Sequence, residues 1–335
     1  MIINIRYIFV LSYIFLLFGF FISEDLNGNA LEDYVGQFPI VVEFAEDYKN
    51  SFLNYDNLEK GNSRQSPIFF YALSLLYKFG LNENTIRIIN LNICFFSIIV
   101  FYFCLKLKYP YIKNYLVALF AVSISLSPSF RSLAIWPNSI NLGLIFFLIS
   151  IFYYLNFLEH KKFLFVILNI LFLVIASYIS PNYSVFSIFF FYKYLKHIKQ
   201  NIKIFYIIFL NFILSLPALF YLFYFDQFFF FQNVVNPNVN NDFNINNIVN
   251  KFSIIITIIF FHLLPFLNKM FFKVENKVKN IEVVFLVIFL LLVIFYFNYP
   301  YFISGGGFFF KVSNYLFDNN ILFYLFCAIS FYILT

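Results

Sequence analysis

Two adjacent carboxylates, Glu32 and Asp33, have the clearest capacity for acid–base chemistry in this sequence. They follow the first apolar stretch closely, so a membrane-spanning helix there would hold them just outside the bilayer. A carboxylate in that position can accept the proton of an attacking hydroxyl group or help to hold a metal ion near it. Since neighbouring side chains diverge on a regular backbone, one of the two would have this role. Taken alone, both residues fit solvated loop acids somewhat better.

Arginines are the candidate partners for a phosphate group, because guanidinium groups bind phosphate oxygens through paired hydrogen bonds. Three of them, Arg64, Arg87 and Arg131, are expected on the same side of the membrane as the two carboxylates. Arg131 stands beside two serines at the end of an apolar stretch, which suits a lipid phosphate headgroup. The alternative is ordinary snorkelling at a helix end. Arg87 follows Glu83 by four residues, which favours an ion pair within one helical turn.

The remaining reactive side chains indicate no second centre. Cys94, Cys104 and Cys327 lie inside apolar stretches and lack the spacing of a disulfide or metal site. His262 also lies in an apolar stretch, where a lone packed histidine is a better explanation than a proton relay. The glycines at 305–307 fit an outer loop better than a phosphate-binding nest.

The elements that position these residues follow from the composition. The chain has 335 residues, of which 62% are hydrophobic and 11% charged, and its mean hydropathy is +0.84. Soluble domains carry roughly 25% charged residues, and no water-soluble core hides this much apolar surface, so lipid must cover it. The net charge of +6 does not indicate a nucleic-acid partner, because the lysines form short runs between apolar segments. The predicted fold class is an all-α, polytopic transmembrane helical bundle within a single integral membrane domain, residues 1–335.

About ten apolar stretches are candidate membrane spans, since a spanning helix needs about 20 apolar residues. The first is predicted to be uncleaved with an inward N-terminus, because no small-x-small cleavage site follows it. The stretches are 5–22, 88–105, 115–130, 138–157, 163–180, 182–195, 204–224, 252–268, 281–298 and 319–335.

The distribution of basic residues sets the predicted orientation. Pro67 to Phe79 is apolar but only 13 residues long, which is short for a crossing. If this segment lies at the outer surface instead, 14 of the 22 basic residues fall on the cytoplasmic side, as the positive-inside rule requires. Residues 23–87 then form one acidic outer loop, and residues 88–335 contain the remaining spans.

This outer loop holds ten of the sixteen acidic residues and two predicted surface helices. Pro39 suits the first position of one helix, whose apolar residues share a face. Ser66 can cap the other helix and Pro67 can open it. Such helices lie in the membrane interface with their apolar faces among the headgroups, where they would roof a cavity.

Four segments carry a resemblance to a known family. In order along the chain, they are Asn29-Ala-Leu-Glu32-Asp33-Tyr34, Gln65-Ser66-Pro67-Ile-Phe-Phe-Tyr71, Gly80-Leu-Asn82-Glu83-Asn-Thr-Ile-Arg87, and Ser127-Pro128 through Leu133-Ala-Ile-Trp136-Pro137-Asn138. Their order and spacing resemble the GT-C membrane glycosyltransferases that use dolichyl- or polyprenyl-phosphate sugars, the protein mannosyltransferase and aminoarabinose transferase relatives. The resemblance covers about residues 1–195.

The resemblance implies a role for each candidate site residue. Asp33, with Glu32 beside it, takes the position of the family's catalytic aspartate. Arg131 would steady the lipid phosphate. Gln65 and Asn138 would orient substrate. Trp136 fits an interfacial aromatic belt or a surface on which a sugar stacks.

Two departures from the family pattern bear on the mechanism. Gln65 and Ser66 stand where the family often has His-Pro, and Asn138 stands where an aspartate is usual. An amide can bind a hydroxyl group but cannot act as a base or a strong metal ligand. Both changes weaken a mechanism that depends on a divalent metal, and no metal-ligand residues are assigned.

The implied function is transfer of a sugar from a polyprenyl-phosphate donor at the outer face of an inner membrane. The acceptor would be a lipid-linked glycan, a lipid or a protein, and membrane lipids would surround the chain. Two alternatives stay open. One is a non-catalytic transporter or flippase for lipid-linked glycans, which predicts charges inside spans and two related halves. The other is a degenerate GT-C scaffold that only binds a partner.

Overall fold

The computed structural model describes residues 4–25, 30–55, 66–224, 245–264, 280–299, 307–317 and 319–334. Over these ranges the regular structure is entirely helical, as the composition predicts, and no strand occurs in them. The chain forms two compact units, residues 1–234 and 235–335. The sequence analysis predicts a single domain over the same residues.

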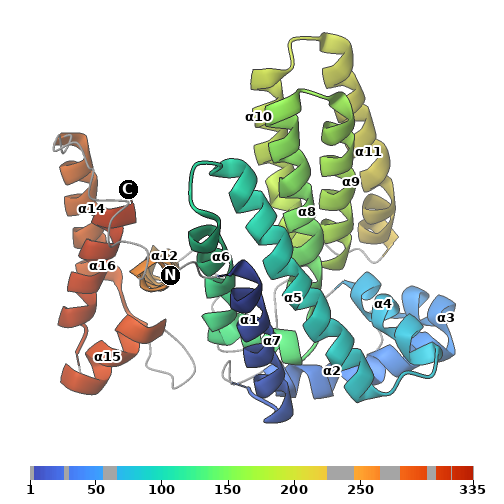
Figure 1. Ribbon diagram of the computed structural model, residues 1–335, viewed down its shortest axis with the longest axis horizontal. Helices are drawn as coiled ribbons and strands as arrows, with labels where there is room; N and C mark the ends of the chain where they lie inside the picture. The colour runs from blue at the N-terminus through green and yellow to red at the C-terminus, as the bar shows by residue number, and fades with distance from the viewer. Residues whose placement is uncertain are drawn as a thin grey trace. The chain divides into compact units, whose positions relative to one another are not determined.

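The first unit contains the candidate site (Figure 1). Helices α8 to α11 run side by side, and the short helices α2 to α4 lie at one end of them. The bounds are α1 (Ile5–Phe21), α2 (Ala30–Glu46), α3 (Tyr48–Leu53), α4 (Pro67–Lys78), α5 (Glu83–Lys108), α6 (Asn114–Val122), the 3-10 helix η2 (Ser123–Leu126), α7 (Pro128–Ile135), α8 (Ser139–His160), α9 (Phe163–Ile179), the 3-10 helix η3 (Pro181–Val185), α10 (Phe186–His197) and α11 (Asn201–Tyr224).

The second unit is a smaller helical cluster. Phe297, Phe310 and Phe323 pack together in its buried core. Gly307 opens one of its helices with a φ of +74°, so at that glycine the structure has a helix where the sequence predicts loop. Residues 305 and 306 lie outside the described ranges. The bounds are α12 (Ile245–Leu263), α14 (Asn280–Tyr296), α15 (Gly307–Phe317) and α16 (Ile321–Leu334).

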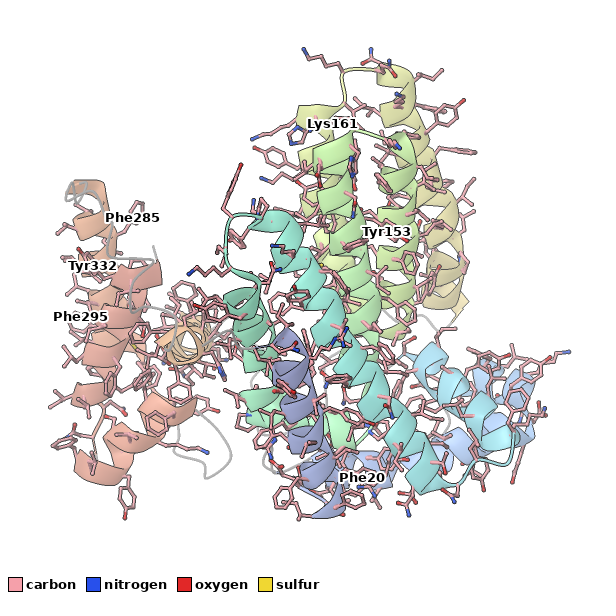
Figure 2. All side chains as sticks on the ribbon, viewed as in Figure 1. Phe20, Tyr153, Lys161, Phe285, Phe295 and Tyr332 are labelled. Atoms are coloured by element: carbon pink, nitrogen blue, oxygen red, sulfur yellow. The ribbon has the colours of Figure 1, made fainter. Side chains whose placement is uncertain are left out.

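Several helices are able to cross a membrane. Four of the described helices are long and apolar enough, namely Glu83–Lys108, Ser139–His160, Asn201–Leu219 and Ile245–Leu263. A bent pair, Asn114–Leu126 with Pro128–Ile135, would make a fifth. Each of the ten predicted stretches coincides at least in part with a helix. Side chains on the helix surfaces are largely aromatic and aliphatic, as around Tyr153 of α8, whereas Lys161 marks the polar turn after that helix (Figure 2). In the described ranges the protein is therefore all-helical, and several of its helices are suited to span a membrane.

The predicted span 115–130 is not one straight helix. Helix α6 continues into η2, and α7 then leaves at an angle of 71°. Pro128 stands in the first turn of α7, where its missing N–H costs no helical hydrogen bond. A proline also disfavours helical backbone in the residue before it, and Ser127 is extended with ψ of 122°. The break therefore follows from the Ser127-Pro128 pair.

The helices of the predicted outer loop differ from the prediction in two respects: there are three of them, α2 to α4, rather than two, and the first begins earlier. Helix α2 begins at Ala30, so Pro39 lies inside it and the prediction that Pro39 opens the helix is wrong. The Asp25 carboxylate accepts hydrogen bonds from the first two N–H groups of α2, those of Ala30 and Leu31, at 3.2 and 3.3 Å. Asp25 thereby caps the start of the helix. The second prediction is confirmed, because the Ser66 hydroxyl caps α4 and Pro67 opens it.

The apolar faces of α2 and α4 pack against each other. Ile40, Val41 and Phe44 of α2 are buried together with Phe69 and Phe70 of α4. The rings of Phe44 and Phe70 stack with centroids 6.4 Å apart. Helices α2 to α4, which the sequence predicts to lie outside the membrane and which are here called the outer segment, thus share a small hydrophobic core beside α5 and α9.

Candidate functional site

The C-terminal end of the broken helix α7 is held by side chains of its neighbours. The Asn90 amide of α5 donates to two α7 carbonyls at 2.8 and 3.1 Å. Arg87 Nε, also of α5, donates to a third at 3.3 Å, and the Asn141 amide of α8 donates to a fourth at 3.2 Å. The last carbonyls of any helix lack partners within it. In an apolar environment such groups must be satisfied by protein. Asn90 and Arg87 do so for the last three carbonyls of α7, whereas Asn141 binds the Phe130 carbonyl near the start of the helix.

A buried ion pair joins the end of α1 to α7. Glu24, in the turn after α1, binds the Arg131 guanidinium, and the two side chains are only 5% and 13% exposed. The Trp136 indole donates to the Glu24 backbone carbonyl at 3.2 Å. Gly19 leaves room for the pair, because a Cβ there would lie 2.7 Å from Glu24 Oε2. The guanidinium of Arg131, which the sequence predicts to bind a phosphate, is therefore already paired with the Glu24 carboxylate.

Arg87 is buried rather than paired with Glu83. Its guanidinium lies 3.6 Å from the centroid of a Trp136 ring and 4.9 Å from that of Phe20. Its Nη1 donates to Asn84 at 3.2 Å. The predicted ion pair with Glu83 is wrong: both residues are described, and no salt bridge joins them. A neutral amide one residue further along takes that place.

Four buried polar atoms of this region have no hydrogen-bond partner in the part of the chain that the structure describes. They are Glu24 Oε1, Tyr34 Oη, Arg87 Nη2 and Arg131 Nε. We call this set of side chains, together with Trp136, the polar junction. Two arginines against one glutamate give it a net positive charge. Its unpaired atoms retain the capacity to bind a polar group.

Asp33 lies beside the polar junction on the first turn of α2. Its carboxylate is exposed, whereas the next residue, Tyr34, is buried against Trp136 with ring centroids 5.8 Å apart. Partial burial raises the pKa of Asp33 above its ordinary value, and the negative charges of Glu32 and Asp25 raise it further. A carboxylate with a raised pKa is a stronger base once it is ionised.

The other predicted site residues have structural contacts. Asn138 Oδ1 accepts the N–H of Ile140 at 2.9 Å and caps α8, a role that the sequence itself signals because asparagine is a preferred cap. Trp136 is 5% exposed, so it does not belong to an exposed aromatic belt, and Arg87 covers one of its faces. Gln65 lies outside the described residues. No group of three or more His, Cys, Asp or Glu side chains suited to a metal gathers in the described ranges.

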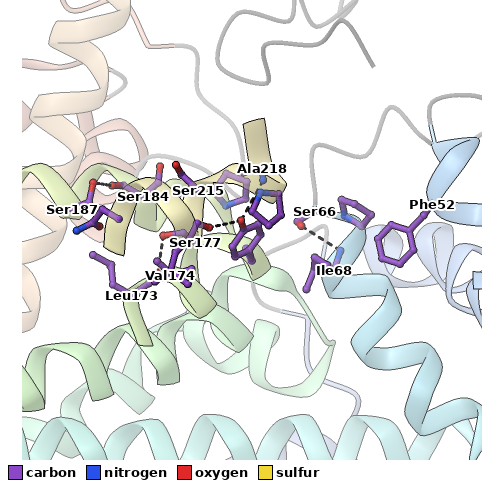
Figure 3. Close-up of a pocket in the computed structure, with 16 residues that line it drawn as sticks. Phe52, Ser66, Ile68, Leu173, Val174, Ser177, Ser184, Ser187, Ser215 and Ala218 are labelled. Atoms are coloured by element: carbon purple, nitrogen blue, oxygen red, sulfur yellow. Dashed lines mark hydrogen bonds between the residues drawn. The ribbon is translucent and has the colours of Figure 1, made fainter. Parts of the chain in front are cut away.

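A cavity of about 470 Å³, here called the groove, lies between the outer segment and helices α9 to α11 (Figure 3). Its lining is mostly apolar and includes no charged side chain. Sequence reasoning missed it, although serines that interrupt the apolar stretches of α9 to α11 were a signal. The lining residues are Phe52, Ser66, Pro67, Ile68, Leu173, Val174, Ser177, Tyr178, Pro181, Ser184, Ser187, Asn211, Leu214, Ser215, Pro217 and Ala218.

The polar groups of the groove are mostly committed to helix carbonyls. Ser177, Ser187 and Ser215 each donate to a carbonyl three or four residues earlier, at 2.7 to 2.8 Å. The Asn211 amide does the same at 2.8 Å. A lining with few free donors and no cation suits an uncharged, largely apolar ligand better than a phosphate.

The structure thus separates two features that the sequence analysis treats as one site. Arg131 and Trp136 belong to the polar junction, Asp33 precedes its Tyr34 in the chain, and none of the three lines the groove. Phe52 and Ser66 connect the outer segment to the groove as part of its wall. Comparison with protein-family models, with characterised proteins and with solved structures gives no match for this chain. Function must therefore be argued from these two features.

Proposed function

We propose that this chain is a membrane glycosyltransferase that transfers a sugar from a polyprenyl-phosphate donor to an acceptor at the outer face of an inner membrane. The observation that carries the proposal is the groove, an uncharged cavity of about 470 Å³ with one wall from the acidic outer segment. An isoprenoid chain is long, apolar and uncharged, and burying it there would remove apolar surface from water or headgroups. The carboxylates of the outer segment would meet the headgroup.

In this proposal the chain has about ten spans, a cytoplasmic N-terminus and outer helices α2 to α4 at the membrane surface. Asp33 accepts the proton of the acceptor hydroxyl as that oxygen attacks the anomeric carbon, and the polyprenyl phosphate leaves. The raised pKa of Asp33 supports this assignment. Glu32, whose charge contributes to that pKa, is the residue that tunes it. The acceptor is a lipid-linked glycan, a lipid or a protein.

The phosphate would lie at the polar junction, because the groove offers it no cation. Arg131 contributes Nε, which has no partner in the described ranges, while Glu24 fixes the guanidinium. Asn138 contributes its amide nitrogen, since its oxygen caps α8. Gln65 precedes the groove residue Ser66 and would contact substrate there. Trp136 supports Arg87 through its ring.

The direct test is transfer from a radiolabelled polyprenyl-phosphate sugar in membranes that contain the Asp33→Asn variant. The proposal expects transfer to fall by about 10²-fold or more, the contribution of a general base. Glu46→Gln, an exposed carboxylate at the other end of α2, is the matched control and should transfer normally. Undiminished transfer by Asp33→Asn would remove the catalytic assignment.

A flippase for lipid-linked glycans is the second candidate, and the buried Glu24, Arg87 and Arg131 favour it. Charges inside membrane proteins often mark a transport path. Reconstituted vesicles distinguish the two functions. Movement of a fluorescent polyprenyl-phosphate sugar between leaflets, without its consumption, would identify a flippase. Release of polyprenyl phosphate would identify a transferase.

A further inference from the structure

Helix α11 contains a proline at the groove. Pro217 lies within the helix, where it has no N–H to donate and its ring clashes with the carbonyl four residues earlier. Helices bend at such positions, and also where a side chain enters the hydrogen-bond ladder. Both causes meet here, because a tyrosine of α9 reaches the same turn.

The Tyr178 hydroxyl bridges one turn of α11. It donates to the Leu214 carbonyl at 2.7 Å and accepts the Ala218 N–H at 3.2 Å. These two backbone groups are four residues apart, so they are the natural partners of a helical hydrogen bond. The hydroxyl therefore bridges the two backbone groups, and it links α11 to α9. Figure 3 shows Ala218, the donor of the second of these bonds, among the residues that line the groove.

The groove depends on this turn, because Tyr178, Leu214, Pro217 and Ala218 all line it. We propose that the Tyr178 hydroxyl is a latch and Pro217 a hinge, which together control lateral opening of the groove between α9 and α11. With the latch closed, the C-terminal turns of α11 stay against α9. Release lets them swing aside and admits an apolar chain from the bilayer. Only the identity of that chain rests on the proposed function.

The test measures distances between spin labels in lipid nanodiscs, with the buried Cys94, Cys104 and Cys327 replaced by alanine. The outer pair joins Val185, after α9, to Phe223, beyond the hinge. The control pair joins Leu164 of α9 to Phe205 of α11, before the hinge. All four labelled side chains are exposed.

Tyr178→Phe keeps the ring and removes the latch. We expect the long-distance population of the outer pair to rise roughly three- to tenfold, as the loss of one or two hydrogen bonds allows, while the control pair stays unchanged. Tyr206→Phe, which alters an exposed tyrosine of α11, should change neither pair. An unchanged outer pair, or equal broadening of both pairs, would overturn the latch.

Pro217→Ala adds the hinge to the test. This change restores a backbone N–H within α11 and should return the outer pair of Tyr178→Phe to the wild-type distribution. Persistent broadening in the double variant would overturn the role of Pro217.

A photoreactive polyprenyl phosphate separates this inference from the proposed function. Faster labelling of groove residues in Tyr178→Phe than in the wild type supports both the latch and the polyprenyl-phosphate donor. If the distances respond but the probe never labels the groove, the latch stands and the polyprenyl donor falls. If the probe labels the groove at equal rates in both proteins and the distances do not respond, the latch falls and the donor stands.

Discussion

The polar junction and the groove are two regions of the first unit that are held together in opposite ways. At the junction, charged and amide side chains of α5, α8 and the turn after α1 converge on α7 through directional contacts. In the groove, the helices meet mainly through apolar contacts, and a single tyrosine ties α11 to α9 there. A buried network is costly to disturb because each lost contact leaves a partner unsatisfied. The junction is therefore suited to hold a fixed geometry, and the groove to change shape.

The strongest test of this contrast removes the buried ion pair. Arg131→Gln leaves the Glu24 carboxylate buried without its cation, and breaking such a pair costs about 3–5 kcal/mol. We expect a large fall in the thermal unfolding midpoint in detergent. Arg6→Gln, which removes an exposed charge near the other end of α1, should have little effect.

A double variant adds specificity to that test. Glu24→Arg combined with Arg131→Glu restores opposite charges at the two positions. It should be more stable than either single exchange. Equal stability of Arg131→Gln and the wild type would mean that the pair does not hold α7.

Two glycines give a paired test of packing with opposite signs. Gly19→Ala would place a methyl group 2.7 Å from Glu24 Oε2, and such overpacking costs about 1–3 kcal/mol. At Gly36, inside α2, an added methyl group would meet no atom of the described residues within 4 Å beyond its chain neighbours and the adjacent helix backbone. Gly36→Ala should therefore stabilise the helix by about 0.5–1 kcal/mol. Unfolding midpoints that shift in the same direction would contradict this description of the junction.

The Asn90 amide, which caps the end of α7, contributes less to stability than the buried ion pair. Asn90→Ala leaves two α7 carbonyls without their donor, at a cost of about 1–3 kcal/mol. Asn156 is the matched control, because its amide donates only to a carbonyl of its own helix at 2.8 Å. Asn156→Ala should cost much less. Thermal unfolding of both variants, measured side by side, decides whether the broken helix depends on its neighbours.

The sequence predicts the helices better than their contacts. Hydropathy locates α1, α5, α8 and α9 within a few residues, because lipid imposes long apolar stretches. The sequence prediction of one span over residues 115–130 missed the break that Ser127-Pro128 causes. The donors from α5 and α8 that hold α7 are not brought together by sequence spacing either. In the sequence, Glu24 is one acid among ten in the outer loop, and only the fold reveals its burial against Arg131.

The same limit applies to the candidate site. Asp33 lies in the first turn of α2, a position that acidic residues favour. Asn138 caps α8, as asparagine commonly does. The serines of α9 to α11 are a weak signal that does not locate the groove, because its walls come from α3, α4, η3 and α9 to α11. A cavity built by helices far apart in sequence is a property of their packing.

The smallest expected effect concerns the carboxylate beside the junction. Burial and the charges of Glu32 and Asp25 raise the pKa of Asp33 above 3.8. A general base works only when ionised, so transfer should fall as the pH drops through this raised pKa. Glu32→Gln removes one negative charge and should move that acid limb to lower pH. Burial is the larger cause, so the limb should stay above pH 3.8. A pH–rate profile of both proteins measures the shift, and an acid limb that Glu32→Gln leaves in place would assign the limb to another group.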